Sequence, residues 1–173
     1  MKTNHITFLF HLVREIPYGD FGLRSAEAVL ENKKGSCSGK HLLLGRLYEL
    51  GGLEVAYMMG KTNFRSLNPF LPEHLKLSHD VFDFHNFLKV RIKRSWYSVD
   101  ATFDSAFMKF GFAVNIDWRA DENCKIAFKT IDPVKVSNLV QAKKAAIDSL
   151  SMSQREERER FFKSFVGWAR SIQ

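Results

Sequence analysis

The sequence is poor in cysteine and has no long apolar run, and each scarcity excludes a class of protein. Its 173 residues include only two cysteines, Cys37 and Cys124, too few for the disulfide framework of a small secreted domain. Free thiols suit a reducing compartment, so we expect a cytoplasmic protein. No apolar run reaches the roughly 20 residues that a membrane-spanning helix needs. The apolar residues 6–10 are followed by His11 and Arg14 without a small-residue cleavage site, so we expect no signal peptide.

The common nucleotide and metal motifs are also missing. Residues 35–41 loosely resemble a phosphate-binding loop, but the second glycine comes too early and His41 occupies a position that needs Ser or Thr. Cys37 with His41, or the His and Asp residues of 79–85, could be considered as zinc ligands, but no paired ligand motif repeats. No Asp-rich loop has calcium-ligand spacing. We therefore expect no metal and no cofactor.

The charge is positive but dispersed. The formal net charge is +7, with lysines and arginines scattered among glutamates. The densest basic pattern, Lys89, Arg91 and Lys93, lacks the interleaved aromatics of single-strand nucleic-acid binders. We therefore expect a solvated face and no nucleic-acid partner. The length and the 45% hydrophobic content predict a single domain with a full core, comprising a core at about 18–131 and a C-terminal helical segment at about 133–173.

One cysteine stands where a tight turn runs into an apolar helix. Leucines at helical spacing follow Cys37, and Gly51-Gly52 then ends the pattern. Cys37 therefore falls in the first turn, where free N–H groups and the helix dipole lower the pKa of a thiol. A lone cysteine can instead be a small buried hydrophobe, but its Ser, Gly and Lys neighbours favour an open position.

A predicted hairpin supplies an imidazole and a carboxylate. Residues 83–92 and 96–104 alternate in polarity as strands do, and His85 belongs to the wetter face of the first strand. With a two-residue turn at 93–94, Asp100 is a diagonal neighbour of His85 on the same sheet face. A thiol, an imidazole and a carboxylate are what acyl-transfer chemistry needs, whereas each residue alone is more simply structural. Asp104 shares the face of Asp100 and is the reserve orienting acid.

These stretches together closely resemble the core of the transglutaminase-like superfamily. The resemblance covers about residues 18–104. Its motifs are Gly35-Ser36-Cys37, Gly51-Gly52-Leu53-Glu54-Val55, His85-Asn86-Phe87 and Trp96-Tyr97-Ser98-Val99-Asp100-Ala101-Thr102, together with a helix at 26–34 that leads toward the cysteine. Phe87 and Ala101 depart from the Trp and Pro that the family commonly has, and neither change removes a catalytic group. The calcium requirement of animal members is not carried over.

The resemblance implies a papain-like α+β fold in which the cysteine helix packs on an antiparallel sheet. Cys37 would be the nucleophile, His85 the general base and acid, and Asp100 the orienting carboxylate. Family members use an aromatic or amide side chain upstream of the cysteine as an oxyanion donor, for which Tyr18 is the candidate here. The implied activity is cleavage or transfer of acyl groups of peptide or side-chain amides through a thioester, with a peptide or protein amide as substrate and an amine as possible acceptor.

Three alternatives remain open at this stage. One is a catalytically silent interaction module that holds a partner with the 61–78 loop and the C-terminal helix. The others are N-acetyl transfer to small amines, as in arylamine N-acetyltransferases, and amide hydrolysis of the peptide N-glycanase type. The sequence leaves the oligomeric state open.

The remaining chain yields further predictions from its periodicity. We expect helices at about 4–16, 26–34, after Pro133 and toward the C-terminus, a loop at 18–22, and a strand at 53–59. The long connection 61–78 is a candidate substrate-facing rim. Alternation at 112–118 and 124–130 predicts a second hairpin that buries Cys124. Ser153 and Glu156 form a capping-box pattern for the last, strongly amphipathic helix, which we expect to dock on the core.

Overall fold

The computed structural model describes residues 1–20, 22 and 24–173, and its fold is mixed α+β. Four strands form one antiparallel sheet in the order β3-β2-β1-β4. They are β1 (Glu54–Asn63), β2 (Phe82–Ile92), β3 (Ser95–Val99) and β4 (Thr130–Val136). The two central strands, β1 and β2, are the longest, and β2 is the strand that carries His85.

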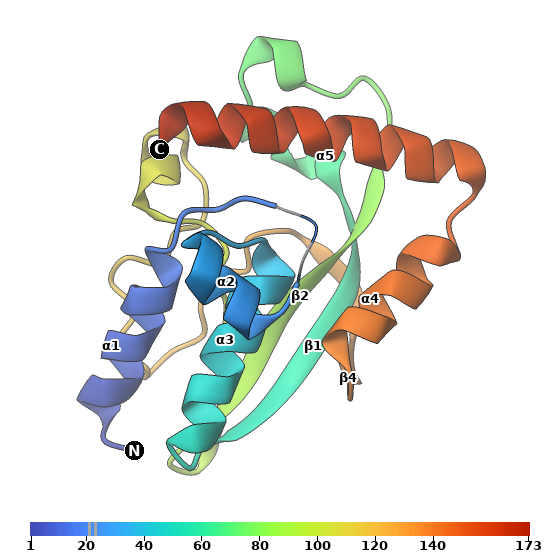
Figure 1. Ribbon diagram of the computed structural model, residues 1–173. Coiled ribbons are helices and arrows are strands. Elements are labelled where there is room, and N and C mark those ends of the chain that lie inside the picture. The colour runs from blue at the N-terminus through green and yellow to red at the C-terminus, as the bar shows by residue number, and fades with distance from the viewer. Residues whose placement is uncertain (21, 23) are drawn as a thin grey trace.

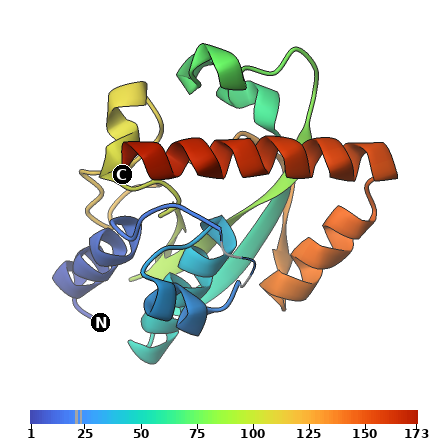
Figure 2. The ribbon, with the colours of Figure 1, turned by 45° about the horizontal axis from the view of Figure 1, so that its top comes forward.

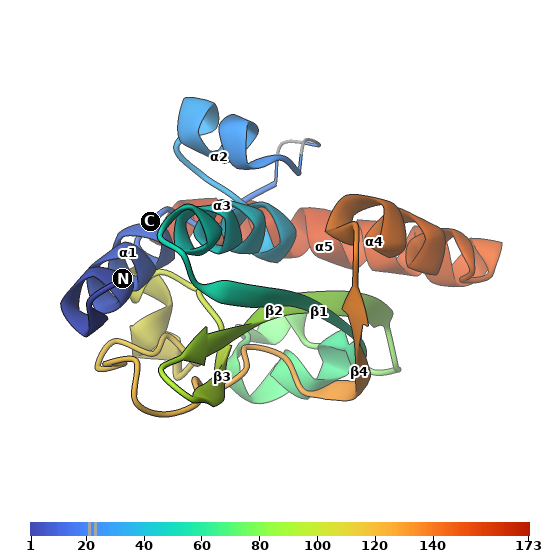
Figure 3. The same ribbon diagram turned by 90° about the horizontal axis from the view of Figure 1, so that it is seen from below.

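Helices cover one side of this sheet, as Figure 3 shows for α1, α3, α4 and α5. The α-helices of the described residues are α1 (Thr3–Arg14), α2 (Ala26–Asn32), α3 (Cys37–Leu50), α4 (Leu139–Asp148) and α5 (Met152–Ile172). The connections contain the 3-10 helices η1 (Phe64–Phe70), η2 (Glu73–Leu75) and η3 (Ser105–Phe110). The long α5 crosses one end of the sheet, and α4 lies beside β1 and β4 (Figures 1 and 2).

The first core packs the cysteine helix against the sheet. Leu43 and Leu44 of α3 are buried in one cluster with Leu88 and Val90 of β2, and α1 adds its apolar face to the same cluster. Each element contributes residues at its own period, which is about 3.6 for the helices and two for the strand. Burial of these side chains fixes α3 on the sheet.

The second core is aromatic and receives the C-terminal helix. Phe161 and Phe165 of α5 are buried together with Phe103 and Phe107 from the segment after β3 and with Phe64 from η1. Most of these rings meet at tilted or edge-to-face angles, which favour aromatic pairs beyond their area burial. The prediction that the last helix docks on the core is therefore confirmed.

The predicted hairpin is confirmed in register, but its second strand, β3, ends at Val99 and not at the predicted residue 104. Ile92 pairs with Ser95 across a two-residue turn, and the ladder continues to Leu88 opposite Val99. Lys93 adopts a left-handed conformation with φ 58°, which the tight turns of hairpins require. The expected helices at the start of the chain, after Ser25 and after Pro133 are also present.

The second predicted hairpin is wrong. Residues 112–129 form no strand, and the following strand, β4, pairs instead with β1. Asn115 explains the difference, because its side chain bonds the backbone N–H and C=O of Lys125 and the carbonyl of Asp100. Phe112 and Trp118, which alternate within the first predicted strand, are buried in different cores, so their alternation does not mark one strand face. Cys124 is buried, as predicted.

Two smaller predictions also change. The 61–78 connection is not an open rim, because it continues β1 and then forms η1 and η2 with Leu67, Leu71 and Leu75 buried. The capping box of α5 lies at Ser151 and Gln154, two residues before the predicted pair. Part of the loop predicted at 18–22 lies outside the described residues, namely Phe21. Within the described part of the chain, no helix is long and apolar enough to cross a bilayer.

Candidate functional site: a cysteine, a histidine and an aspartate

Cys37 is the first residue of α3, and the helix end at this point is open. The preceding Ser36 makes no side-chain cap bond to the first-turn N–H groups, so these donors and the positive end of the helix dipole stay available at Cys37. Gly39 lets α2 approach this turn, since a Cβ there would lie 2.7 Å from Val29 Cγ2. Sequence, local structure and packing therefore agree on a thiol at a helix N-terminus.

Two contacts set where α3 begins relative to its neighbours. Ser38 Oγ donates to Asn86 Oδ1 at 2.7 Å, which ties the first turn of α3 to β2 one residue beyond His85. On the other side Gly35 N–H donates to Pro17 O at 3.0 Å, and Gly19 N–H donates to Gly35 O at 3.2 Å. This bridge brings the segment of Tyr18 against the residues that precede Cys37.

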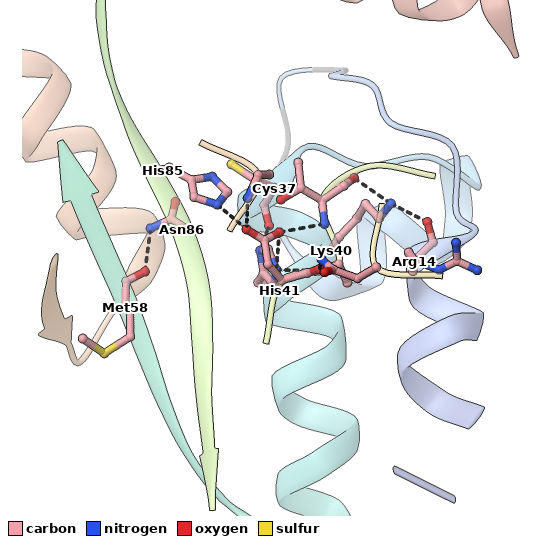
Figure 4. Close-up of polar contacts among 12 residues, drawn as sticks. Arg14, Cys37, Lys40, His41, Met58, His85 and Asn86 are labelled. Carbon is pink, nitrogen blue, oxygen red and sulfur yellow. Dashed lines mark hydrogen bonds and ion pairs between the residues drawn. The ribbon is translucent and has the colours of Figure 1, made fainter. Parts of the chain in front are cut away.

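His85 and Asp100 meet directly. His85 Nε2 lies 2.7 Å from Asp100 Oδ2, and both side chains are buried. The other ring nitrogen, Nδ1, has no hydrogen-bond partner among the described residues. Figure 4 shows the ring beside the sulfur of Cys37. The three side chains predicted to act together are therefore close together in the structure. Cys37, His85 and Asp100 are called the triad.

Asp100 is held as a carboxylate. Besides His85, it accepts the backbone N–H of Thr102 at 3.0 Å and that of Ala127 at 2.8 Å. Burial opposes ionisation, but the charge and hydrogen bond of His85 lower the pKa of Asp100 well below its usual range. In turn, burial lowers the pKa of His85, yet the stronger combined effects of Asp100 and Cys37 raise it to about 9. His85 is therefore protonated at neutral pH.

A second histidine, His41, supports the arrangement as a neutral ring. Its Nε2 accepts the backbone N–H of Ala101 at 2.9 Å, so the proton must be on Nδ1, which donates to Cys37 O at 2.8 Å. Burial lowers the pKa of His41 to about 4, which agrees with a neutral ring. The 3.5 Å approach of its Nε2 to Asp100 is therefore not an ion pair of charged groups. His41 connects the start of α3 to the backbone beside Asp100.

Cys37 has the electrostatics of a thiolate despite its burial. Burial alone would raise its pKa, but the charge of Lys143 and the adjacent His85 ring lower the pKa to about 6. Lys143 Nζ lies 3.9 Å from the sulfur. For Cys124, by contrast, burial raises the pKa well above that of a free thiol. The two cysteines are thus electrostatically opposite.

Lys143 belongs to a group of three buried charges that we call the charge cluster, consisting of Asp83, Lys143 and Arg158. Lys143 of α4 lies 3.5 Å from Asp83 Oδ2 and donates to Phe84 O at 2.5 Å. Arg158 of α5 donates from Nε to Asp83 Oδ1 at 2.7 Å. The two C-terminal helices thus pair two cations with one carboxylate of β2, two residues from His85.

The site is enclosed, which corrects two expectations. His85 is 1% exposed, so it does not lie on a wetter face, because α4, α5 and the 101–129 segment cover this end of β2. Cys37 is 5% exposed and its polar neighbours Ser36, Ser38 and Lys40 are buried too. The cavity beside the thiol holds only about 10 Å³, enough for about one water molecule.

Tyr18 and Asp104, the other two site residues predicted from the sequence, have different roles in the structure. Tyr18 lines the cavity together with Cys37, and burial raises the pKa of its phenol well above the usual value, so it stays a protonated donor. Asp104 does not reach His85. It accepts Tyr18 N–H at 2.7 Å and Gln173 Nε2 at 3.0 Å, and it caps η3 through Ala106 N–H at 3.0 Å. Asp104 thus anchors the Tyr18 segment and does not orient the imidazole.

A buried lysine that sequence reasoning missed ties the surrounding elements together. Lys40 donates to the carbonyls of Arg14, Ile16 and Thr102 at 2.7–2.9 Å (Figure 4). These three bonds connect the end of α1, the first turn of α3 and the backbone just after Asp100. Lys40 follows Cys37 by three residues, which is one helical turn, but nothing local distinguishes a buried lysine from an exposed one. Lys143 was missed for a related reason, since 106 residues separate it from Cys37.

No protein-family model matches the sequence, and no curated protein matches it. Any assignment of function therefore depends on the residues themselves.

Proposed function

We propose that the protein is a transglutaminase-like thiol enzyme that cleaves or transfers acyl groups of peptide or side-chain amides through Cys37, His85 and Asp100. The observation that carries the proposal is the placement of the His85 ring, with Nε2 bonded to Asp100 and Nδ1 left for the Cys37 sulfur. The arrangement of α3 on an antiparallel sheet that carries the imidazole is compatible with the papain-like architecture that the resemblance implies.

The reaction would begin with a thiolate and an imidazolium. The Cys37 sulfur attacks the carbonyl carbon of an amide, a C–S bond forms, and the carbonyl oxygen becomes an oxyanion. The backbone N–H of Cys37 and the hydroxyl of Tyr18 are the candidate donors to that oxyanion. His85 then gives its Nδ1 proton to the departing nitrogen, the C–N bond breaks, and a thioester on Cys37 remains.

The second half of the cycle returns the enzyme to its starting state. Water or an amine attacks the thioester while neutral His85 takes its proton, and the C–S bond breaks to release acid or a new amide. Asp100 stays ionised throughout, holding Nε2–H so that Nδ1 faces the sulfur. Because the cavity is so small, an amide substrate requires displacement of side chains that line it, among them Arg24 and Phe162.

The enclosure of the site supports the alternative function, a catalytically silent interaction module. A silent interaction module would have no need to admit a substrate, and a 5% exposed Cys37 fits such a protein. The two functions differ in what the sulfur does, because a structural thiol reacts no faster than a free one, whereas a thiolate held by His85 reacts at low pH.

Alkylation of Cys37 by iodoacetamide at pH 6 tests this difference, in a Cys124→Ala background that leaves a single thiol. The proposal predicts stoichiometric labelling that is lost in His85→Ala, measured by intact mass. A panel of amides and thioesters, read as an acyl adduct on Cys37, then tests acyl transfer itself. Labelling no faster than that of a free thiol, with no adduct from the panel, contradicts the enzyme and supports the interaction module.

A further inference from the structure

The residues that surround the sulfur include a cation from outside the region of the triad. Lys143 is 4% exposed and lies on α4, which follows the sheet in the chain. Its Nζ is fixed by Phe84 O at 2.5 Å and by Asp83 Oδ2 at 3.5 Å, and it approaches Cys37 Sγ at 3.9 Å. An ammonium at this distance from a sulfur, away from solvent screening, favours the thiolate.

The balance of buried charge supports the same conclusion. The charge cluster alone sums to one positive charge, because Lys143 and Arg158 share the single carboxylate of Asp83. The pair of His85 and Asp100 is neutral when the imidazole is protonated. Buried charge without a partner is costly. The cluster lacks one negative charge, and a Cys37 thiolate supplies it.

Charged and titratable side chains surround Cys37 from several elements. They are Asp83 and His85 of β2, Lys143 of α4, Arg158 of α5, His41 of α3, and Tyr18 and Arg24 from the segments before α3. Tyr18 and His41 are neutral at pH 7, and Arg24 is partly exposed to water. Among these cations, Lys143 and then His85 are the ones whose charges lower the pKa of Cys37.

We propose that Lys143 is a positioning residue of the site, whose ammonium keeps the Cys37 sulfur ionised so that the C-terminal helices complete the nucleophile. This role rests on the proposed function for its catalytic meaning, but it concerns the ionisation of the thiol and can be measured without a substrate. It also gives α4 a function beyond packing, because docking of α4 brings the charge to the sulfur.

The test is the pH profile of Cys37 alkylation in the Cys124→Ala background. Lys143→Gln removes the charge and keeps a donor for Phe84 O, and its thiol pKa should rise by about 1–3 pH units, with the rate at high pH retained. Lys143→Arg keeps the charge, so the pKa of the Cys37 thiol should be lower in this variant than in Lys143→Gln. Lys144→Gln is the matched control, because Lys144 is the exposed neighbour that pairs with Asp148, and its profile should follow the parent. Superimposed profiles for Lys143→Gln and Lys144→Gln would overturn the proposal.

A second measurement leaves Lys143 unchanged, so it does not depend on whether a Lys143 variant folds. In the parent chain, the ¹⁵N signal of Lys143 Nζ should move as the thiol titrates, and this movement should vanish in Cys37→Ala. A signal that ignores the thiol overturns the proposal even if Lys143→Gln does not fold. If no amide or thioester acylates Cys37 while the profiles shift as expected, the proposed enzyme function fails and the role of Lys143 stands.

Discussion

Strand β2 carries two buried titratable residues, Asp83 and His85, that belong to differently built networks. His85 finds its carboxylate across one hairpin, 15 positions along the chain. Asp83 finds its cations on α4 and α5, which are 60 and 75 positions away. The first network depends on strand register, whereas the second exists only when the C-terminal helices dock. The triad and the charge cluster can therefore be separated by mutation.

The largest effect should come from Asp100→Asn in the triad. An amide in place of the carboxylate no longer stabilises the imidazolium and can donate to Nε2, which moves the ring proton to Nδ1 and blocks its role as base. We expect turnover of any substrate that acylates Cys37 to fall by about 10³- to 10⁴-fold. The comparison variant is Asp104→Asn, which changes an acid outside the triad and should lose far less. Equal losses in the two variants would argue against an orienting role for Asp100.

Asp83→Asn should affect stability instead. It leaves Lys143 and Arg158 buried without their shared carboxylate, and breaking a buried pair in this way costs about 3–5 kcal/mol. The free energy of unfolding, measured from urea titrations, should fall by this amount. Asp80→Asn is the matched control, since Asp80 is an exposed acid two residues before the same strand and pairs with Arg65. If both variants unfold at the same urea concentration, the charge cluster does not hold the C-terminal helices.

The pH dependence should report both networks at once. With the pKa of Cys37 lowered to about 6 and that of His85 raised to about 9, the thiolate–imidazolium pair is populated between these values. Below pH 6 the sulfur is protonated and attack stops, and above pH 9 the imidazolium is lost and the leaving amine stays unprotonated. We expect a bell-shaped rate profile whose limbs approach tenfold per pH unit. The two apparent values belong to the pair as a whole, and a profile without an acid limb would contradict it.

The sequence predicts the triad better than the charge cluster, because the triad depends on local structure and the cluster on the docking of distant helices. The turn at Lys93 fixes the register by its length, and the ladder runs to Val99, so Asp100 in the next position comes within reach of His85 by local rules. Cys37 at a helix start is equally local. Burial of His85 is not, because the segments that cover it lie far along the chain. The same applies to Lys143, whose contact with the sulfur depends on how α4 docks.

Two local patterns misled for physical reasons. Alternating Phe112, Val114, Ile116 and Trp118 has the period of a strand, but the side chain of Asn115 replaces the ladder bonds that a partner strand would provide. Polar residues around Cys37 suggested exposure, yet Ser38 and Lys40 satisfy their hydrogen bonds inside the protein. Composition alone cannot distinguish a solvated polar side chain from a buried and paired one.

The smallest effect should sharpen the same comparison at a helix start. Asn138 caps α4 by accepting Gln141 N–H at 3.0 Å, and Asn138→Ala should cost about 1 kcal/mol. Ser25 caps α2 in the same way through Ala28 N–H, so Ser25→Ala should cost a similar amount in the region of the triad. Because α4 holds Lys143 beside the sulfur, only Asn138→Ala should also change the pH profile of Cys37 labelling, by increasing the fraction of molecules in which α4 is undocked and the thiol has lost that charge. Hydrogen exchange should show faster opening confined to α4 in that variant, and equal pH profiles of labelling in both variants would show that α4 has no special connection to the sulfur.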